Sequence, residues 1–141
     1  MIRCNINDWP VVRMHFHSYP SYEEVINWLS DCDRILKEKR EFVLISTFDE
    51  HYQFEHRARK KQAIWFKSVK NELSKWCLGM FRVTQDPVII KKINAPAMSK
   101  GMPFQCIVVE DVKKAELQAH ELLTKCNLPS PWDKKLSETH E

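Results

Sequence analysis

Three consecutive segments decide the fold: Phe42-Val-Leu-Ile-Ser-Thr-Phe48, a helix-forming stretch from Glu55 to Cys77, and Gly79-Met-Phe-Arg-Val83. The first and third are apolar runs, and the second repeats apolar residues at helical spacing. A buried strand, a long amphipathic helix and a second strand in this order form a βαβ unit, in which the two strands are parallel. The loop after the first strand therefore lies at the carboxyl edge of a sheet, where α/β proteins commonly bind their ligands.

A hairpin and a capped helix precede this unit. Residues 2–6 and 11–17 are predicted to pair as two short strands, because the turn between them, Asn7-Asp-Trp-Pro10, is rich in turn-forming residues. Ser21 and Glu24 have the spacing of a capping box, in which each side chain binds the backbone of the other residue. This spacing predicts that a helix begins there, and the apolar residues that follow form one stripe.

The helices and strands after the βαβ unit are predicted from the spacing of apolar residues and from residues that typically begin or end helices. Gly79 is predicted to stop the long helix, and residues 89–97 are predicted to form a short one. Residues 104–109 form a strand that is apolar enough to be covered on both faces. Asp111 opens a last helix, whose apolar stripe ends at Cys126.

This order predicts an α/β protein with a mixed sheet of about four to five strands. Helices are expected mainly on one face, because right-handed crossovers place successive helices on the same side of a sheet. The length of 141 residues suits a single domain, which we expect over residues 1–126, followed by a C-terminal tail over residues 127–141. Hydrophobic residues make up 43% and charged residues 29% of the chain, which excludes disordered and fibrous classes.

Composition also bears on compartment and cofactors. No apolar stretch reaches the roughly 18 residues that a membrane span needs, and the first residues lack a secretory apolar region, so we expect a cytoplasmic protein. The five cysteines are odd in number, widely spaced and embedded in apolar sequence. A disulfide framework or a zinc ribbon has paired cysteines, so buried free thiols are the better interpretation, and no cofactor is expected.

Several scattered positions resemble a known family. They are Trp9-Pro10 before a strand, a capped helix that leads into Arg40-Glu-Phe-Val-Leu-Ile45, Arg59-Lys-Lys-Gln62 followed by Trp65-Phe-Lys67, Cys77-Leu-Gly-Met-Phe-Arg-Val83, and residues 103–109 before an alanine-rich last helix. In this order, about residues 5–125 resemble the bacterial STAS-like proteins, which are related to the anti-sigma-factor antagonists. The resemblance implies an α/β fold and a regulatory module that binds another protein without catalysis.

One motif of that wider group is missing. Antagonists that are switched by phosphorylation present a serine in an Asp-x-Ser-Gly context where a strand meets the next helix. Here that junction reads Ser46-Thr-Phe-Asp-Glu-His51. Ser46 and Thr47 are open to modification, but hydroxyls at strand ends are more often simply hydrogen-bonded. The phosphorylation switch is therefore not carried over to this chain.

We expect a protein partner to bind at the strand-to-helix loop and the adjoining basic helix. The candidate partner-binding residues are Thr47, Asp49, His51, His56, Arg57, Lys60 and Lys61. Charge would steer the partner to this surface, and a small apolar patch would then be buried. Nucleic acid is not favoured, because the net charge is only +3 and Trp65 and Phe66 lie on the apolar stripe instead of among the cations. The edge strand of the hairpin also permits a homodimer.

The histidines allow two further interpretations. His51 and His56 have carboxylates nearby, as a general base requires, but no nucleophile or oxyanion loop accompanies them, so an enzyme is not expected. His15 and His17 lie on one face of a strand and, with His51 or His56, would supply three nitrogen ligands of the kind that suits zinc. Exposed strand positions also accept histidine freely, so no metal site is assigned.

The alternative function is binding of a small apolar, lipid-like ligand. A fold of this type can hold such a molecule between helices and sheet, in a pocket lined here by Trp and Met residues and closed by the loop from Met98 to Met102. Phe104 borders the same loop, and Trp132 stands in the tail. Apolar side chains outside regular elements mark either a partner groove or a segment that folds back on its own domain.

Overall fold

The structure is a computed structural model that describes residues 2–50, 52–96 and 102–133. Strands and helices alternate after the first two strands. Their bounds are β1 (Arg3–Asn5), β2 (Val11–Phe16), α1 (Tyr22–Lys37), β3 (Phe42–Phe48), α2 (His56–Trp76), β4 (Cys77–Val83), α3 (Pro87–Ile93), β5 (Gln105–Val109) and α5 (Val112–Lys125).

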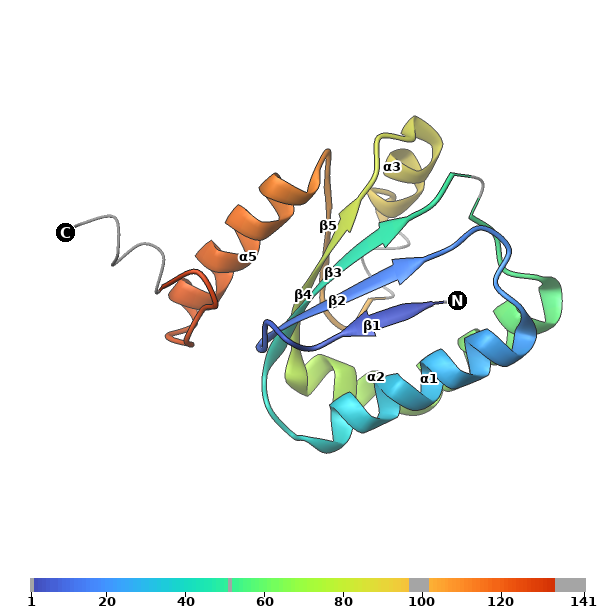
Figure 1. Cartoon of the computed structure of the whole chain (residues 1–141), viewed down its shortest axis with the longest axis horizontal. Coiled ribbons are helices and arrows are strands. Elements are labelled where there is room, and N and C mark those ends of the chain that lie inside the picture. Colours follow the sequence, from blue (N-terminus) through green and yellow to red (C-terminus); the bar gives the residue numbers. More distant parts are fainter. Residues whose placement is uncertain (1, 51, 97–101, 134–141) are drawn as a thin grey trace.

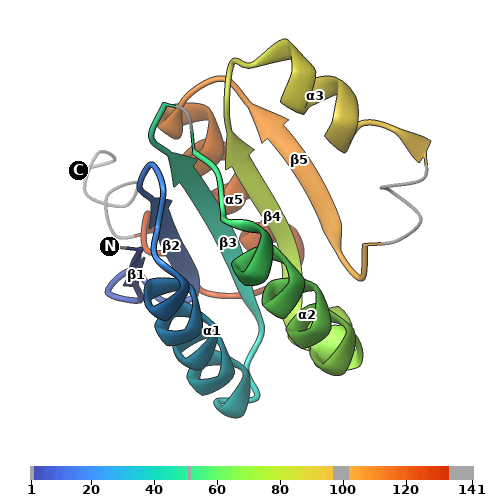
Figure 2. The same ribbon diagram turned by 90° about the vertical axis from the view of Figure 1, so that its right-hand side faces the viewer.

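The strands of the described segments form one mixed sheet in the order β1-β2-β3-β4-β5, which Figure 2 shows nearly face-on. β1 pairs antiparallel with β2, and every later pair of neighbours is parallel. Strands that follow each other in the chain are therefore neighbours in the sheet, and the carboxyl ends of β2 to β5 meet along one edge. The predicted α/β class with a mixed sheet is confirmed.

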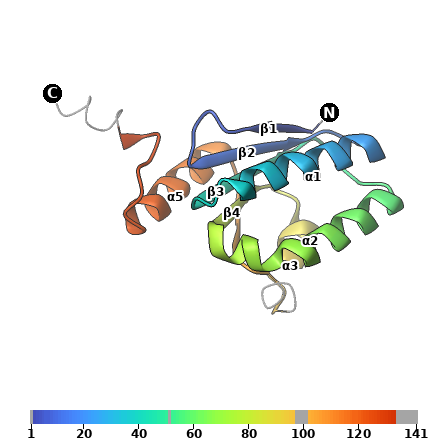
Figure 3. The ribbon, with the colours of Figure 1, turned by 90° about the horizontal axis from the view of Figure 1, so that it is seen from below.

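α1 and α2 lie together on one face of the sheet, as Figure 3 shows. The hydroxyl of Ser21 accepts a hydrogen bond from the backbone N–H of Glu24 at 3.1 Å, and this capping box starts α1 where the sequence predicts it. The apolar stripe of α1 is buried, and in α2 Ala58 and Leu73 are buried. These side chains pack with Val12, Met14, Phe16, Phe42 and Leu44 of the sheet in the larger apolar cluster of the protein.

α5 lies on the opposite face, at the left of the sheet in Figure 1. Asp111 accepts a hydrogen bond from the backbone N–H of Lys114 at 2.8 Å and caps this helix, as predicted. Its buried residues pack with the other face of the sheet in a second cluster, formed by Val11, Val43, Ile45, Phe81, Val109, Ala115, Ala119 and Leu123. The crossover rule that groups α1 with α2 does not apply to α5, because no further described strand follows it.

The prediction that Gly79 stops α2 is wrong. α2 ends at Trp76, and β4 begins at Cys77 without an intervening loop. Gly79 lies inside β4, where a Cβ atom would come within 3.2 Å of Leu122 Cδ2 of α5. The absence of a side chain at this position therefore lets α5 pack closely against the sheet.

Two other sequence-based predictions also differ from the structure. β5 is an edge strand, and of its residues only Val109 is buried, so it is not covered on both faces. The short helix α3 begins at Pro87 instead of residue 89. Asp86 accepts a hydrogen bond from the backbone N–H of Val88 at 2.9 Å, and Pro87 takes the first helical position, where its missing N–H has no consequence.

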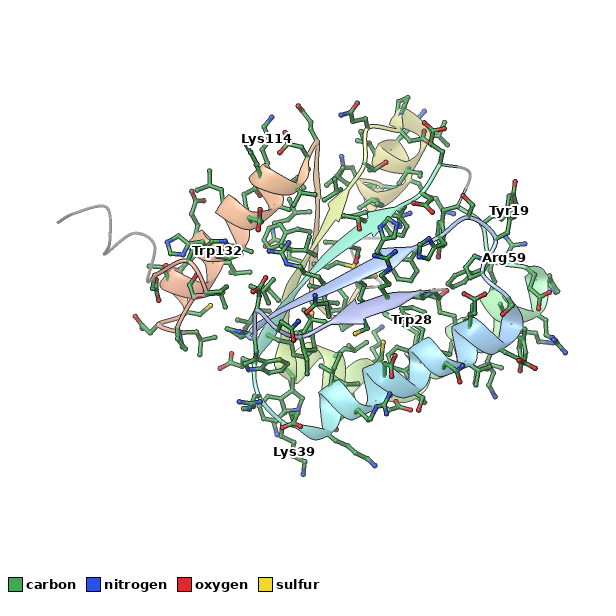
Figure 4. All side chains as sticks on the ribbon, viewed as in Figure 1. Tyr19, Trp28, Lys39, Arg59, Lys114 and Trp132 are labelled. Atoms are coloured by element: carbon green, nitrogen blue, oxygen red, sulfur yellow. The ribbon has the colours of Figure 1, made fainter. Side chains whose placement is uncertain are left out.

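Residues 127–133 of the tail pack back on α5. His120 of α5 is hydrogen-bonded through Nδ1 to the buried hydroxyl of Ser130 at 2.7 Å. The ring of Trp132 lies edge-on to His120 at a centroid distance of 6.1 Å, and Figure 4 shows it beside α5. This part of the tail therefore folds back on its own domain, at α5 and not at the sheet edge.

The five cysteines are free thiols, in agreement with the sequence analysis. Cys32 and Cys77 are buried as expected, and Cys4 and Cys106 are half-buried. Cys126 is exposed because it follows the last turn of α5 instead of facing the sheet, so the expectation of burial is wrong there. Within residues 2–50, 52–96 and 102–133, no helix combines the length and the apolar character needed to cross a lipid bilayer.

Candidate functional site

A pocket of about 280 Å³ lies between the sheet and the helices α1 and α2. One wall is a single face of the sheet, because alternate residues of four neighbouring strands point to the same side. These wall residues include Met14, Phe16, Leu44, Ser46, Phe48, Met80, Arg82 and Cys106. The opposite wall consists of Trp28, Cys32, Ile35 and Leu36 from α1 and Gln62, Trp65, Phe66 and Leu73 from α2.

Aromatic rings gather at the end of the pocket where β2 and β3 finish. The rings of Phe16 and Phe48 are stacked with an interplanar angle of 11° and a centroid distance of 5.0 Å. Tyr52 packs against Phe48 at 4.9 Å, and Trp28 meets Phe16 edge-on at 5.0 Å. Such ring pairs contribute roughly 0.5–1.5 kcal/mol each beyond the burial of their area, so this end of the pocket is held rigidly.

Arg82 is the charged residue among the side chains that line this wall, which otherwise consists of apolar residues and Ser46. It is paired with Ser46 across β3 and β4, so both side chains point into the pocket. The guanidinium carbon lies 4.2 Å from the centroid of the Phe48 ring. Its Nε atom is buried and makes no hydrogen bond to any described residue. The titratable groups of the described chain that act on it are Tyr52 and Cys106, which are not carboxylates.

Burial changes the proton affinity of the polar groups beside Arg82. It lowers the pKa of the Arg82 guanidinium from its ordinary value, because the charged form loses water. It raises the pKa of Tyr52 to about 12, so the phenol stays neutral and can donate a hydrogen bond at physiological pH. The Ser46 hydroxyl is also buried. Arg82, Tyr52 and Ser46 thus present hydrogen-bond donors in one apolar pocket, which is the chemistry that an anionic oxygen requires.

The pocket continues toward the edge of the sheet at β5. Ile93, Met102, Phe104 and Cys106 line both the pocket and an adjoining space of about 470 Å³. The adjoining space is more polar and also contacts Asn94, Pro103 and Gln105. Met102 therefore lines the pocket as the sequence analysis predicts for its Met residues, Phe104 lines it as well, and Met98 lies outside the described residues.

A second polar group lies on the other face of the sheet, at the carboxyl ends of β2 and β3. His15 Nε2 lies 2.8 Å from Asp49 Oδ1, and His17 Nδ1 lies 3.1 Å from Asp49 Oδ2. His15 Nδ1 is also 2.7 Å from the hydroxyl oxygen of Thr47. Hydrogen bonds from His15 and then His17 hold the pKa of the Asp49 carboxyl below its usual value, so this side chain is a carboxylate.

The seven residues predicted to bind a partner do not form one group. Thr47 and Asp49 join His15 and His17, as described above, and His51 lies outside the described residues. Arg57 lies on α2, with its guanidinium 3.7 Å from the centroid of the Tyr22 ring and 3.5 Å from Glu55 Oε1. The other three candidates, His56, Lys60 and Lys61, are exposed on the first turns of α2. A partner-binding role for these residues stays a prediction.

Sequence reasoning missed Arg82 and Tyr52 as candidate site residues. One signal was available, since Met80 and Arg82 alternate with the buried Phe81 in β4 and must share the face that bears Met80. The contact of Arg82 with Phe48 could not be read from the sequence, because it joins β4 to β3 and the register of these two strands emerges only in the folded sheet.

Three comparisons with known proteins found no relative of this chain. No protein-family model, no curated protein and no solved structure matches this chain.

Proposed function

We propose that this protein binds a small amphipathic molecule, with a hydrocarbon portion between the helices and the sheet and an anionic head group at Arg82. The observation that carries the proposal is a half-buried arginine in an apolar pocket, whose buried Nε has no hydrogen-bond partner and which has no carboxylate partner among the described residues. A buried cation is costly unless an anion pairs with it. A carboxylate or phosphate oxygen from a ligand would supply that missing partner, and arginine binds both in a forked geometry.

The size of the pocket supports a single short chain as the hydrocarbon portion. Its volume of about 280 Å³ is near the lower end of known ligand sites, which hold roughly 300–1,000 Å³. The lining combines rigid aromatic rings at one end with Met14, Met80 and Met102, whose side chains adapt to ligand shape. The adjoining space beside α3 and β5 offers an entry route.

The length of the ligand chain tests this proposal. Each methylene group moved from water into the pocket contributes about 0.8 kcal/mol, so affinity for straight-chain carboxylates should rise about fourfold per added carbon until the pocket is full. Titration calorimetry with a series of saturated fatty acids measures this slope. No saturable binding by any member of the series, or an affinity that is independent of chain length, would contradict the proposal.

A variant that fills the pocket provides the matched test. Cys106 lines the pocket on the edge strand β5, where a larger side chain is tolerated better than in the centre of the sheet. Cys106→Phe should shorten the longest chain that binds, whereas Ile107→Phe, one residue away on the opposite face, should leave the series unchanged. Equal effects of both variants would indicate general damage to β5 and not a ligand pocket.

A protein partner at α2 is the second candidate function. Ile64 is 58% exposed on α2, and Lys60, Lys61 and Lys67 lie three or four residues away on the same helix. An exposed aliphatic side chain among lysines has the composition of a surface that docks an acidic protein segment. The five free thiols support a reducing, cytoplasmic setting for both functions, and the STAS-like resemblance stays a proposal beside them.

A further inference from the structure

Two imidazoles and one carboxylate converge on the face of the sheet opposite the pocket. One ligand atom from each of His15, His17 and Asp49 lies within 4.8 Å of the other two. Two histidine nitrogens with one carboxylate oxygen are a common donor set for zinc and other divalent transition ions. From this geometry we propose that His15, His17 and Asp49 bind a divalent transition-metal ion, for which Zn²⁺ is the probe.

The register of the sheet holds these three residues together. His15 lies in β2 and His17 directly follows the last residue of that strand, and both side chains reach Asp49 on the same side of the sheet. β2 and β3 pair with His15 opposite Thr47, and the backbone N–H of Asp49 donates to the carbonyl of Phe16 at 2.9 Å. The parallel ladder therefore extends as far as Asp49 and delivers its carboxylate between the two imidazole rings.

The cluster has room to accept an ion. The side chains of His15, His17 and Asp49 are 33%, 28% and 41% exposed, so they are reachable from solvent and their outer atoms can move. Bonds of about 2.0–2.1 Å to zinc place neighbouring ligand atoms about 3.4 Å apart in a tetrahedron. The present separations of the candidate ligand atoms, 2.8 Å between His15 Nε2 and Asp49 Oδ1 and no more than 4.8 Å for any pair in the cluster, lie on both sides of that value. Small side-chain rotations would therefore reach it, and solvent would take the fourth position.

The hydrogen bond with Thr47 allows His15 to present Nε2 to the metal ion. The observed contacts suit the tautomer in which the Thr47 hydroxyl donates to His15 Nδ1 and His15 Nε2–H donates to Asp49. When Nε2 binds the ion, the ring proton resides on Nδ1, and Nδ1–H donates a hydrogen bond to the Thr47 hydroxyl oxygen. The Thr47 hydroxyl proton then points to the Met14 carbonyl oxygen, which lies 3.5 Å away. A partner of this kind orients a metal-bound histidine and typically changes metal affinity about 10–100-fold.

The metal cluster and the pocket are independent. Thr47 follows Ser46 in β3, and adjacent residues of a strand point to opposite faces. Ser46 lines the pocket, whereas Thr47 contacts His15. Loss of metal binding therefore leaves the ligand proposal intact, and loss of ligand binding leaves the metal proposal intact.

The test is a titration of untagged wild-type protein with Zn²⁺ by calorimetry and with Co²⁺ by visible absorption. We expect one ion per chain and a cobalt spectrum typical of nitrogen and oxygen ligands. His17→Ala and Asp49→Ala should each weaken Zn²⁺ binding at least about 100-fold, and Thr47→Val about 10–100-fold with rescue by Thr47→Ser. Circular dichroism confirms that each variant is folded.

Two control variants make the outcome decisive. His56→Ala removes an exposed histidine outside the cluster, and Cys126→Ser removes the exposed thiol, which would otherwise compete for zinc. Both should bind Zn²⁺ as the wild type does. The proposal is overturned if the wild type binds no ion, if His17→Ala and Asp49→Ala retain full affinity, or if binding disappears in either control.

Discussion

The guanidinium carbon of Arg82 lies 4.2 Å from the centroid of the Phe48 ring, inside the pocket between helices and sheet. Phe48 attracts the cation through its ring face but provides no negative charge. The Nε–H of Arg82 is buried and has no acceptor among the described residues. This arrangement favours a ligand anion at Arg82 and costs stability in its absence.

Replacement of Arg82 by methionine should therefore stabilise the ligand-free protein. Methionine keeps much of the volume and removes a half-buried cation whose buried Nε–H has no described acceptor, and the desolvation of such a group costs about 1–3 kcal/mol. We expect the free energy of unfolding in urea to rise within that range. The matched variant Arg59→Met, on the exposed side of α2, should change it by less than about 0.5 kcal/mol. A clear loss of stability in Arg82→Met would show that the guanidinium supports the fold.

The close approach of α5 to β4 predicts that Gly79 does not accept a branched side chain. A Cβ at this position comes within 3.2 Å of Leu122 Cδ2 and 3.5 Å of the Gln105 carbonyl oxygen. Gly79→Val should lower the free energy of unfolding by about 1–3 kcal/mol, as overpacking does elsewhere. Truncation of the neighbour in Leu122→Ala should relieve part of that loss, so the double-mutant cycle should show coupling above about 0.5 kcal/mol. Additive effects would contradict the contact.

Thiol reactivity should follow burial. Cys126 is exposed and should react with a thiol reagent at once in the native protein. Burial raises the pKa of Cys77 to about 12, so this thiol stays protonated and should react only after unfolding. Cys106 lines the pocket, and burial also raises its pKa, so it should react slowly and be protected further by a bound ligand. Mass spectrometry of the labelled residues measures all three rates, and rapid native labelling of Cys77 would contradict this order.

The charge of α2 predicts how a protein partner would bind. Contacts to Lys60, Lys61 and Lys67 should weaken as salt rises, because exposed charges are screened over about 10 Å at 0.1 M salt. A glutamate-rich peptide serves as the probe, and Lys60→Glu with Lys61→Glu should reduce its affinity at least about tenfold. Lys113→Glu on α5 is the control for net charge and should have a much smaller effect. Affinity that is indifferent to salt would argue against α2 as the contact surface.

Local patterns in the sequence predicted most helices and strands, because helix caps and the alternation of side chains along a strand depend on residues close together in the chain. The capping box of Ser21 and the Asp111 cap correctly placed two helix starts, and strand alternation correctly placed Met14 and His15 on opposite faces. Gly79 was misread as a helix stop because its role depends on Leu122, which lies far along the chain on another face. A local pattern cannot reveal a close approach between distant segments.

The candidate sites depended more strongly on such distant contacts. His15 and His17 were recognised as a pair from their spacing, but Asp49 joins them only through the register of β2 against β3. Arg82 was overlooked because a lone arginine in a strand is ordinarily solvated. Its partial burial follows from the position of α2 over the sheet and from the stacking of Phe48 on Phe16. Helix and strand patterns do not encode these arrangements.

The most direct test of the ligand proposal compares two head groups and two residues. Decanoic acid and 1-decanol have the same chain, so wild-type protein should bind the acid about 10–100-fold more tightly, as a charge-assisted hydrogen bond worth about 1.5–3 kcal/mol predicts. Arg82→Gln should remove this preference and leave the affinity for decanol nearly unchanged, while Arg59→Gln should keep the preference. Equal binding of acid and alcohol by the wild type, or a preference that survives in Arg82→Gln, would contradict the account.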